Sequence, residues 1–159
     1  MSYDEAMDIK EVEFGDMPPQ AFLLGLLSAF DNRYQACADS FFKEITWKQF
    51  FAIICINLCR EAPTLNDLAE VMGSSHQNVK QILIKLENKG FVMMITDEKD
   101  KRKQRIVITD KCRKFIEEND NQSKTSAEII GSIFEGIDEK NLSITIDTIM
   151  KMERNLSRL

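Results

Sequence analysis

The sequence predicts a mainly α-helical protein with one small β-hairpin, and two observations indicate this fold class. Apolar residues recur at helical spacing through most of the chain. Residues 91–96 and 105–109 instead favour strands, because they are rich in β-branched and aromatic residues or alternate in polarity.

Residues 60–114 carry 12 basic and 8 acidic side chains, whereas the segments before and after them have net charges of −5 and −4. A basic middle between acidic ends suggests a local polyanion-binding face, with a solvated mixed surface as the alternative.

The composition also excludes several classes of protein. The chain has 159 residues, of which 43% are hydrophobic and 30% charged, as in ordinary folded domains. Its apolar runs are far too short to span a membrane and no secretory signal opens it, so we expect a cytoplasmic protein with no membrane partner. His76 is the single histidine, and the common nucleotide-binding and hydrolase motifs are absent, which disfavours an enzyme. Acid–base catalysis by a carboxylate pair stays open.

Four cysteines are scattered along the chain at positions 37, 55, 59 and 112. They form no Cys-x-x-Cys pair, so we expect neither a structural metal nor a cofactor. We interpret them as reduced thiols, and Cys55 and Cys59 as thiols that pack at the margin of a helix face. Oxidation sensing is the alternative, and it would require an exposed cysteine whose thiolate is stabilised.

The first half of the chain predicts two helices after an acidic leader over residues 1–16. Pro18 and Pro19 favour the start of a long helix over 20–42, because proline is tolerated in the first turn. The wide apolar stripe of this helix suggests packing against a partner helix. Thr46 is expected to cap a second helix that runs to about residue 60. We place the following residues on the buried face of that second helix: Trp47, Phe50, Phe51, Ile54 and Leu58.

Two shorter helices are expected next. Thr64 is a predicted cap for a helix over 65–72, which Gly73 would end. Ser74 is followed three positions later by Gln77, a pattern that predicts a capping box at the start of a fourth helix. Gly90 would end that helix. Its buried stripe is predicted to consist of Val79, Ile82, Leu83 and Leu86.

The remaining sequence predicts the hairpin and two further helices. Residues 97–104 form a charged connector between the two strand-like segments. Thr109 or Asp110 is expected to cap a fifth helix that reaches about Ile130. Gly131 and Gly136 would bracket a short break, after which Asp138 caps a last helix that ends near residue 156.

Two short helices joined by a glycine turn and followed at once by a charged hairpin form a winged helix-turn-helix. In this arrangement the second helix enters the major groove of DNA and the hairpin, or wing, reaches along the backbone. Side-chain amides read base edges, whereas lysines neutralise phosphates. On a helical wheel the side opposite the buried stripe carries Gln77, Gln81, Ile84 and Asn88, flanked by Asn78, Lys80 and Lys85.

These positions yield a predicted set of DNA contacts. We expect base contacts from Ser75, Gln77, Asn78 and Gln81. We expect phosphate contacts from Ser74, His76, Lys80, Lys85, Lys101, Lys103 and Arg105. For His76, packing against its neighbours is an equal alternative.

The segment Gly73-Ser74-Ser75-His76-Gln77-Asn78-Val79-Lys80, continued by Leu86 to Val92, resembles the recognition helix and strand start of MarR-family transcriptional regulators. The wing over residues 97–102, which closes in Val107-Ile108-Thr109, is similar to theirs as well. Asp100 and Arg102 match the family's Asp-x-Arg element. The resemblance implies that Arg102 enters the minor groove while Asp100 holds its guanidinium, and a plain surface ion pair is the alternative. His76 departs from the pattern, because commoner family members have arginine there.

The resemblance also implies a homodimer with four regions: a leader (1–16), a dimerisation helix (17–45), a DNA-binding lobe (46–110) and C-terminal dimerisation helices (111–159). The expected function is that of a sequence-specific regulator, in particular a repressor, that binds a pseudo-palindromic site in double-stranded DNA. A small aromatic or oxidising effector would relieve binding. A pocket between the long first helix and the DNA-binding lobe, lined by Phe, Met and Tyr34, is a candidate effector site, although such aromatics more often form plain core. The alternative function is a winged-helix module for protein contacts.

Overall fold

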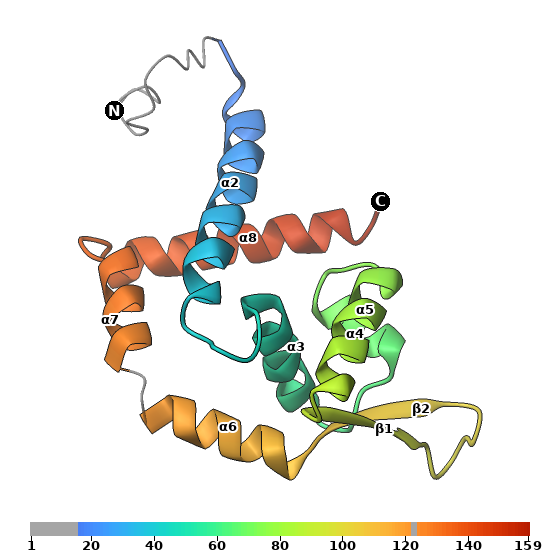
Figure 1. Ribbon diagram of the computed structural model, residues 1–159. Coiled ribbons are helices and arrows are strands. Elements are labelled where there is room, and N and C mark those ends of the chain that lie inside the picture. The colour runs from blue at the N-terminus through green and yellow to red at the C-terminus, as the bar shows by residue number, and fades with distance from the viewer. Residues whose placement is uncertain (1–15, 122–123) are drawn as a thin grey trace. The chain divides into compact units, whose positions relative to one another are not determined.

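The computed structural model describes residues 16–121 and 124–159, and it confirms the predicted class of a mainly helical chain with one antiparallel hairpin (Figure 1). Apart from Asp16, the predicted acidic leader lies outside the described residues. The chain forms two compact units, the first ending at Arg113 and the second beginning at Lys114. No helix in the described part is both long and apolar enough to cross a lipid bilayer. The elements are α2 (Pro19–Asp39), α3 (Trp47–Leu58), α4 (Leu65–Val71), α5 (His76–Asn88), β1 (Val92–Thr96), β2 (Gln104–Ile108), α6 (Asp110–Asn121), α7 (Lys124–Ile133) and α8 (Glu139–Leu156).

Helix α3 lies at the centre of the first unit, where it contacts α2, α4, α5 and β2. The predicted buried face of this helix was wrong. Leu58 is 73% exposed, whereas Ala52 and Ile53, on the other side, are fully buried. The remaining residues predicted for that face are half-buried. A helix that is apolar on nearly every side shows no single stripe, because it is surrounded by neighbours on more than one side.

Capping residues set the helix starts in the first unit. Thr46 and Thr64 both form the predicted caps, and each belongs to a reciprocal capping box, with Gln49 and Asp67 respectively. In each box the threonine oxygen accepts from a backbone N–H that the helix leaves unpaired, and the partner side chain accepts from the threonine N–H. Both starts therefore agree with the sequence analysis.

Two glycines end α4 and α5 in the same way. Gly73 and Gly90 have φ angles of +59° and +74°, a region that glycine enters without steric cost. After each glycine the next backbone N–H turns back into the helix: Ser74 N donates to Ala69 O at 3.0 Å, and Phe91 N donates to Leu86 O at 2.9 Å. The first turn leads α4 into α5, and the second leads α5 into the wing.

The cap of α5 differs from the predicted one by one residue. Ser75, not Ser74, is the N-cap, and its hydroxyl accepts from the backbone N–H of Asn78 at 3.3 Å. Ser74 is unavailable for this role because its backbone belongs to the turn that ends α4. Its hydroxyl instead accepts from the Asn78 amide at 2.8 Å. The predicted stripe is confirmed, since all four of its residues are buried: Val79, Ile82, Leu83 and Leu86.

The hairpin pairs Val92 with Ile108 at its base and Thr96 with Gln104 near its tip. Thr109 closes the base, because its N–H donates to Phe91 O at 3.0 Å. The same residue caps α6, as its hydroxyl accepts from Cys112 N at 3.2 Å. Of the two predicted caps for this helix, Thr109 is thus the one used.

In the C-terminal part, α6 and α7 occupy the stretch in which one helix was expected up to Ile130, and residues 122–123 between them lie outside the described residues. Gly131 lies inside α7 rather than in the predicted break. The predicted cap of α8 is confirmed, with Asp138 accepting from Asn141 N at 2.8 Å. Within a single chain, α8 has no buried residue.

The position of the α5 cap predicts different effects for two adjacent serines. Ser75→Ala removes the acceptor of an unpaired helix N–H, so we expect it to lower the free energy of unfolding by about 1 kcal/mol. Ser74→Ala is the matched control and should have a much smaller effect, because it removes only an exposed side-chain bond. Urea denaturation of both variants measures the difference. Equal effects, or a larger one for Ser74→Ala, would contradict the assignment.

Candidate nucleic-acid interface

The exposed side of α5 is a polar surface opposite the core. Gln77, Asn78 and Gln81 are all exposed, and Lys80 and Lys85 are exposed on its flanks. Ser75 is exposed too, although its oxygen serves as the helix cap. The burial of the opposite stripe leaves these side chains no direction but outward. The geometry therefore presents amides and lysines on one accessible helix face, which is the chemistry that reads base edges and binds phosphates.

His76 is the first residue of α5 and is exposed, so it does not belong to the core. It lines a shallow hollow with Ser74 of the turn and with Asn66 and Glu70 of α4. Asn66 also lines a second hollow, which contains Arg102 of the wing tip. Asn66 therefore lies between the start of α5 and the wing. Asn66 was not predicted as a site residue, because an asparagine in the first turn of a short helix is equally expected at a solvent-exposed position.

The loop that follows the Thr96–Gln104 pair begins at Asp97, which is only 8% exposed; the start of this loop, with Arg105 beside it, is called the wing root here. One carboxylate oxygen accepts from the backbone N–H groups of Lys99 and Asp100, each at 2.8 Å. The other accepts from the guanidinium of Arg105 on β2. The N–H groups of the turn and the Arg105 guanidinium hold the pKa of Asp97 at about 2, well below its ordinary value of 3.8. Asp97 thus stays charged and organises the turn that begins the wing.

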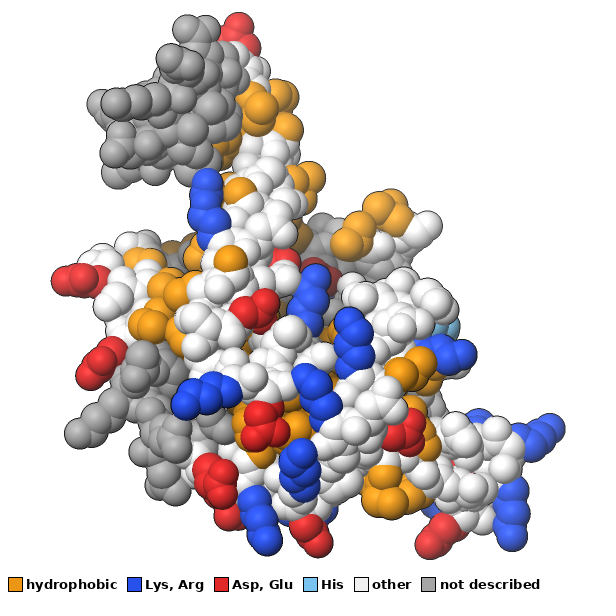
Figure 2. All heavy atoms as spheres, viewed as in Figure 1, with side chains coloured by type: hydrophobic (Ala, Val, Ile, Leu, Met, Phe, Trp, Pro, Cys, Tyr) orange, Lys and Arg blue, Asp and Glu red, His pale blue; other side chains and the backbone are white. Residues whose placement is uncertain are grey.

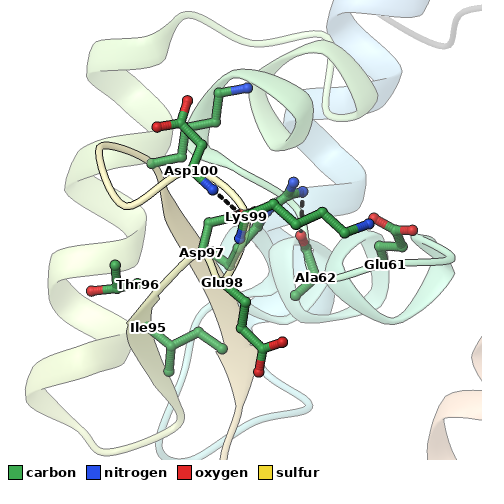
Figure 3. A pocket seen from close by; sticks show the side chains of 10 residues that line it. Glu61, Ala62, Ile95, Thr96, Asp97, Glu98, Lys99 and Asp100 are labelled. Atoms are coloured by element: carbon green, nitrogen blue, oxygen red, sulfur yellow. Dashed lines mark hydrogen bonds and ion pairs between the residues drawn. The ribbon is translucent and has the colours of Figure 1, made fainter.

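Arg105 connects this turn to the helix-turn-helix. Its guanidinium donates to Ala62 O at 2.9 Å and lies 3.9 Å from the carboxylate of Asp67, the capping-box residue of α4. Beside it, the backbone N–H of Ile106 donates to Pro63 O at 2.8 Å. Residues of the wing and of the loop before α4 line one hollow, and Figure 3 shows Ile95 to Asp100 of the wing on one side of it and Glu61 and Ala62 on the other.

These contacts bear on the predicted phosphate contact by Arg105. The side chain is 25% exposed and its guanidinium already serves Asp97 and Ala62. The structure therefore gives it a positioning role at the root of the wing, and a phosphate contact by this residue stays a prediction. The contacts of Arg105 with Asp97 and Ala62 were not predicted, because residues 97–104 were interpreted as one solvated connector.

At the tip of the wing the predicted Asp-x-Arg pair is formed. Arg102 Nε lies 3.1 Å from the Asp100 carboxylate, which also accepts from the Arg102 backbone N–H at 3.2 Å. These bonds from Arg102 lower the pKa of Asp100. The Arg102 side chain is 91% exposed, so its charge projects into solvent. Lys101 and Lys103 are exposed beside it, and Figure 2 shows Lys and Arg side chains projecting from the hairpin end of the molecule.

The cysteines offer little chemistry. Burial raises the pKa of Cys55, and it raises that of Cys112 to about 11, so both thiols are protonated and unreactive near neutral pH. Cys37 is exposed, whereas Cys59 is half-buried and donates to Cys55 O. Among the described residues, no group of three or more His, Cys, Asp and Glu side chains is placed to hold a metal ion.

Tyr34, which was predicted to line an effector pocket, belongs to an aromatic cluster between α2 and α3. Tyr34 meets Trp47 edge-on, with ring centroids 4.9 Å apart, and stacks on Phe30 at 6.2 Å. Trp47 continues the cluster to Phe50 and Phe51. The rings contact one another but are only partly enclosed, since Tyr34 and Trp47 are half-buried and Phe30 is 50% exposed.

A helix-turn-helix whose second helix exposes amides, joined to a pinned hairpin with an arginine at its tip, defines the winged helix-turn-helix class. Residues 45–103 match the sequence model of the MarR family. This segment therefore forms a MarR-type domain, as the sequence resemblance indicated, and members of the MarR family are DNA-binding transcriptional regulators.

Solved structures share the fold over nearly the full chain. MepR of S. aureus, solved as a DNA complex, is 21% identical, with 91% of this chain and 99% of that chain covered and a TM-score of 0.70. A MarR protein of Peptoclostridium difficile is 19% identical, with coverages of 96% and 94% and a TM-score of 0.73. BpsR of Bordetella bronchiseptica, whose DNA binding is described as regulated by 6-hydroxynicotinic acid, is 19% identical, with coverages of 83% and 98% and a TM-score of 0.68.

The wing root predicts an acid-sensitive contribution to stability. Because the pKa of Asp97 is lowered on folding, its contribution is complete above the ordinary value of 3.8 and is lost as the pH falls through about 2. The difference in unfolding free energy between the wild type and Asp97→Asn should be constant above about pH 5 and narrow below pH 4. Denaturant titrations from pH 6 to pH 2 measure it.

The same comparison in an Arg105→Ala background provides the control. In that background the difference in unfolding free energy should fall less at low pH, because Asp97 keeps its backbone donors but loses its ion pair. A difference that stays constant down to pH 2 would show that the carboxylate charge does not stabilise the wing.

Proposed function

We propose that the chain is a homodimeric, sequence-specific repressor that binds a pseudo-palindromic site in double-stranded DNA. The observation that carries the proposal is the pairing of an exposed amide face on α5 with a wing whose tip arginine is held by Asp100 and whose root is pinned to the helix-turn-helix. In this proposal α5 lies in the major groove, with base contacts from Ser75, Gln77, Asn78 and Gln81.

The proposed phosphate contacts come from residues around that face, all of them exposed except the half-buried Ser74. Ser74 and His76 lie at the start of α5, where free backbone N–H groups also favour an anion. Lys80 and Lys85 flank the face, and Lys101 and Lys103 extend the cationic surface along the wing. Arg102 is proposed to enter the minor groove, where a narrow A·T-rich segment attracts arginine.

A second copy of the chain is the proposed partner for the apolar surfaces outside the lobe. In α2, Leu24 and Phe30 are 57% and 50% exposed, and in α8, Ile144 and Met150 are 52% and 51% exposed. Large apolar side chains repeated along a helix favour burial against another subunit. A twofold dimer presents two copies of α5, which suits a DNA site with two half-sites.

We also propose that a small aromatic effector modulates DNA binding through the aromatic cluster of α2 and α3. The cluster joins the long N-terminal helix to the lobe that carries α5, so a ligand inserted among its rings would shift one against the other. The regulation of BpsR by 6-hydroxynicotinic acid, a small aromatic acid, supports this class of ligand. The raised pKa values of Cys55 and Cys112 make an oxidant the weaker alternative.

The proposal predicts strongly salt-dependent binding. A dimer that neutralises six to ten phosphates should lose about 10³-fold or more in affinity between 50 and 200 mM salt. Mobility shifts on a pool of mixed A·T-rich duplexes, followed by titration of the selected sequence at both salt concentrations, measure this loss. Weak binding that does not change with salt would instead favour a winged-helix module for protein contacts.

Arg102→Ala tests the wing against a matched surface pair. We expect this substitution to weaken operator binding about tenfold or more, because it removes a charged group from each of two grooves. Arg113→Ala is the control, since Arg113 also pairs with a nearby aspartate, Asp110, at 2.7 Å. Fluorescence anisotropy should show little change for the control. If the two substitutions change DNA affinity equally, the Asp100–Arg102 pair is a plain surface ion pair and has no role in binding.

A further inference from the structure

The exposed face of α5 contains one apolar side chain among its polar ones. Ile84 is 40% exposed, whereas the other four apolar residues of this helix are buried. At about 100° per residue, Ile84 lies nearly opposite the centre of the buried stripe and close in angle to Gln77, Gln81 and Asn88. All three of these neighbours are exposed. Ile84 is therefore part of the amide ridge rather than an edge of the core.

Folding supplies no reason for an isoleucine at this position. A β-branched residue has lower helix propensity than lysine, glutamine or glutamate, so a solvent-facing turn of helix gains nothing from it. Single exposed apolar residues are common on protein surfaces and need no explanation by themselves. Ile84 differs because its neighbours on the same face are hydrogen-bonding amides and because Lys80 and Lys85 stand on the two sides of that ridge.

The spacing along the helix places Ile84 at a defined depth in a DNA site. It lies seven residues after Gln77, or about 10 Å along the axis at the usual rise of 1.5 Å per residue. At about 3.4 Å per base pair, this is a shift of about three base pairs from the position that Gln77 faces. The only apolar group that a base presents in the major groove is the C5-methyl of thymine.

We propose that Ile84 is a specificity-determining residue that reads a thymine C5-methyl group in each half-site. This inference rests on the proposed function, because it requires α5 to lie in the major groove. Ile84 makes the helix favour thymine at its position through apolar contact, whereas the amides read neighbouring base pairs through hydrogen bonds. The proposal adds a position of readout that hydrogen-bonding residues alone do not provide.

Replacing thymine by deoxyuridine tests the proposal, because it removes the methyl group and keeps every hydrogen-bonding group of the base. The operator is first selected from a random duplex library with the full-length protein. Each thymine is then replaced by deoxyuridine, and affinities are measured by fluorescence anisotropy. At one thymine position we expect binding to weaken about fourfold in one half-site and about 15-fold in both.

Two variants assign the effect to its residue. Ile84→Ala should bind the thymine operator more weakly and no longer distinguish thymine from deoxyuridine at that position. Ile95→Ala is the matched control: Ile95 is also 40% exposed but lies on β1, away from the α5 ridge, and its variant should keep the discrimination. Circular dichroism of Ile84→Ala should be unchanged, since Ile84 lies outside the buried stripe and alanine is a better helix former than isoleucine.

The outcomes separate this inference from the proposed function. Salt-dependent operator binding in which no deoxyuridine weakens the wild type overturns the role of Ile84 and leaves the proposed function standing. The same holds if Ile84→Ala retains the discrimination, or if the selected operator has no thymine under α5. A chain that binds no duplex DNA under any of these conditions overturns the proposed function and this inference with it.

Discussion

The burial of one stripe of α5 is the constraint on which the interface depends. Val79, Leu83 and Leu86 are almost completely enclosed against α3, α4 and β1, so the helix cannot rotate without exposing them to water. Fully burying side chains of this kind stabilises a fold by about 1.5–3 kcal/mol each. Because this burial fixes the rotation of the helix about its axis, it also decides which residues face outward. The amides and Ile84 are presented to solvent as a consequence of core packing, with no contact of their own needed to orient them.

The wing is held by a different kind of interaction. A two-stranded hairpin is marginally stable in isolation, so its direction must be fixed by what it touches. Here the ion pair of Asp97 and Arg105, together with the bond from Arg105 to Ala62 O, fastens the hairpin to the loop that precedes α4. The same loop carries Thr64, whose capping box with Asp67 starts α4. One polar junction thus relates the wing tip to the helix-turn-helix, and a change at Arg105 would alter the reach of Arg102 without touching it.

Local signals made the fold of the lobe predictable, and long-range contacts limited the rest. Gly73 and Gly90 indicate helix ends in the sequence, because few other residues adopt their positive φ angles. The buried stripe of α5 can be recognised because it is the only apolar side of a polar helix. The buried face of α3 was not predictable, since a helix with neighbours on several sides has no stripe to read. The exposed site residues followed from the wheel of α5. The junction of Arg105 did not, because it joins residues 62, 97 and 105 across three separate segments.

Charge distribution explains how a protein of net charge −5 presents a surface for a polyanion. At physiological ionic strength, charges beyond about 8 Å are largely screened, so a phosphate responds to the side chains near it and not to the total. The middle segment carries the basic excess, and Asp97 neutralises Arg105 at the root rather than at the tip. The field along the interface therefore comes from Lys80, Lys85 and the wing cations, whose side chains are exposed. Acidic residues elsewhere in the chain discourage non-specific adhesion while leaving this local attraction in place, which favours binding where shape and base contacts also fit.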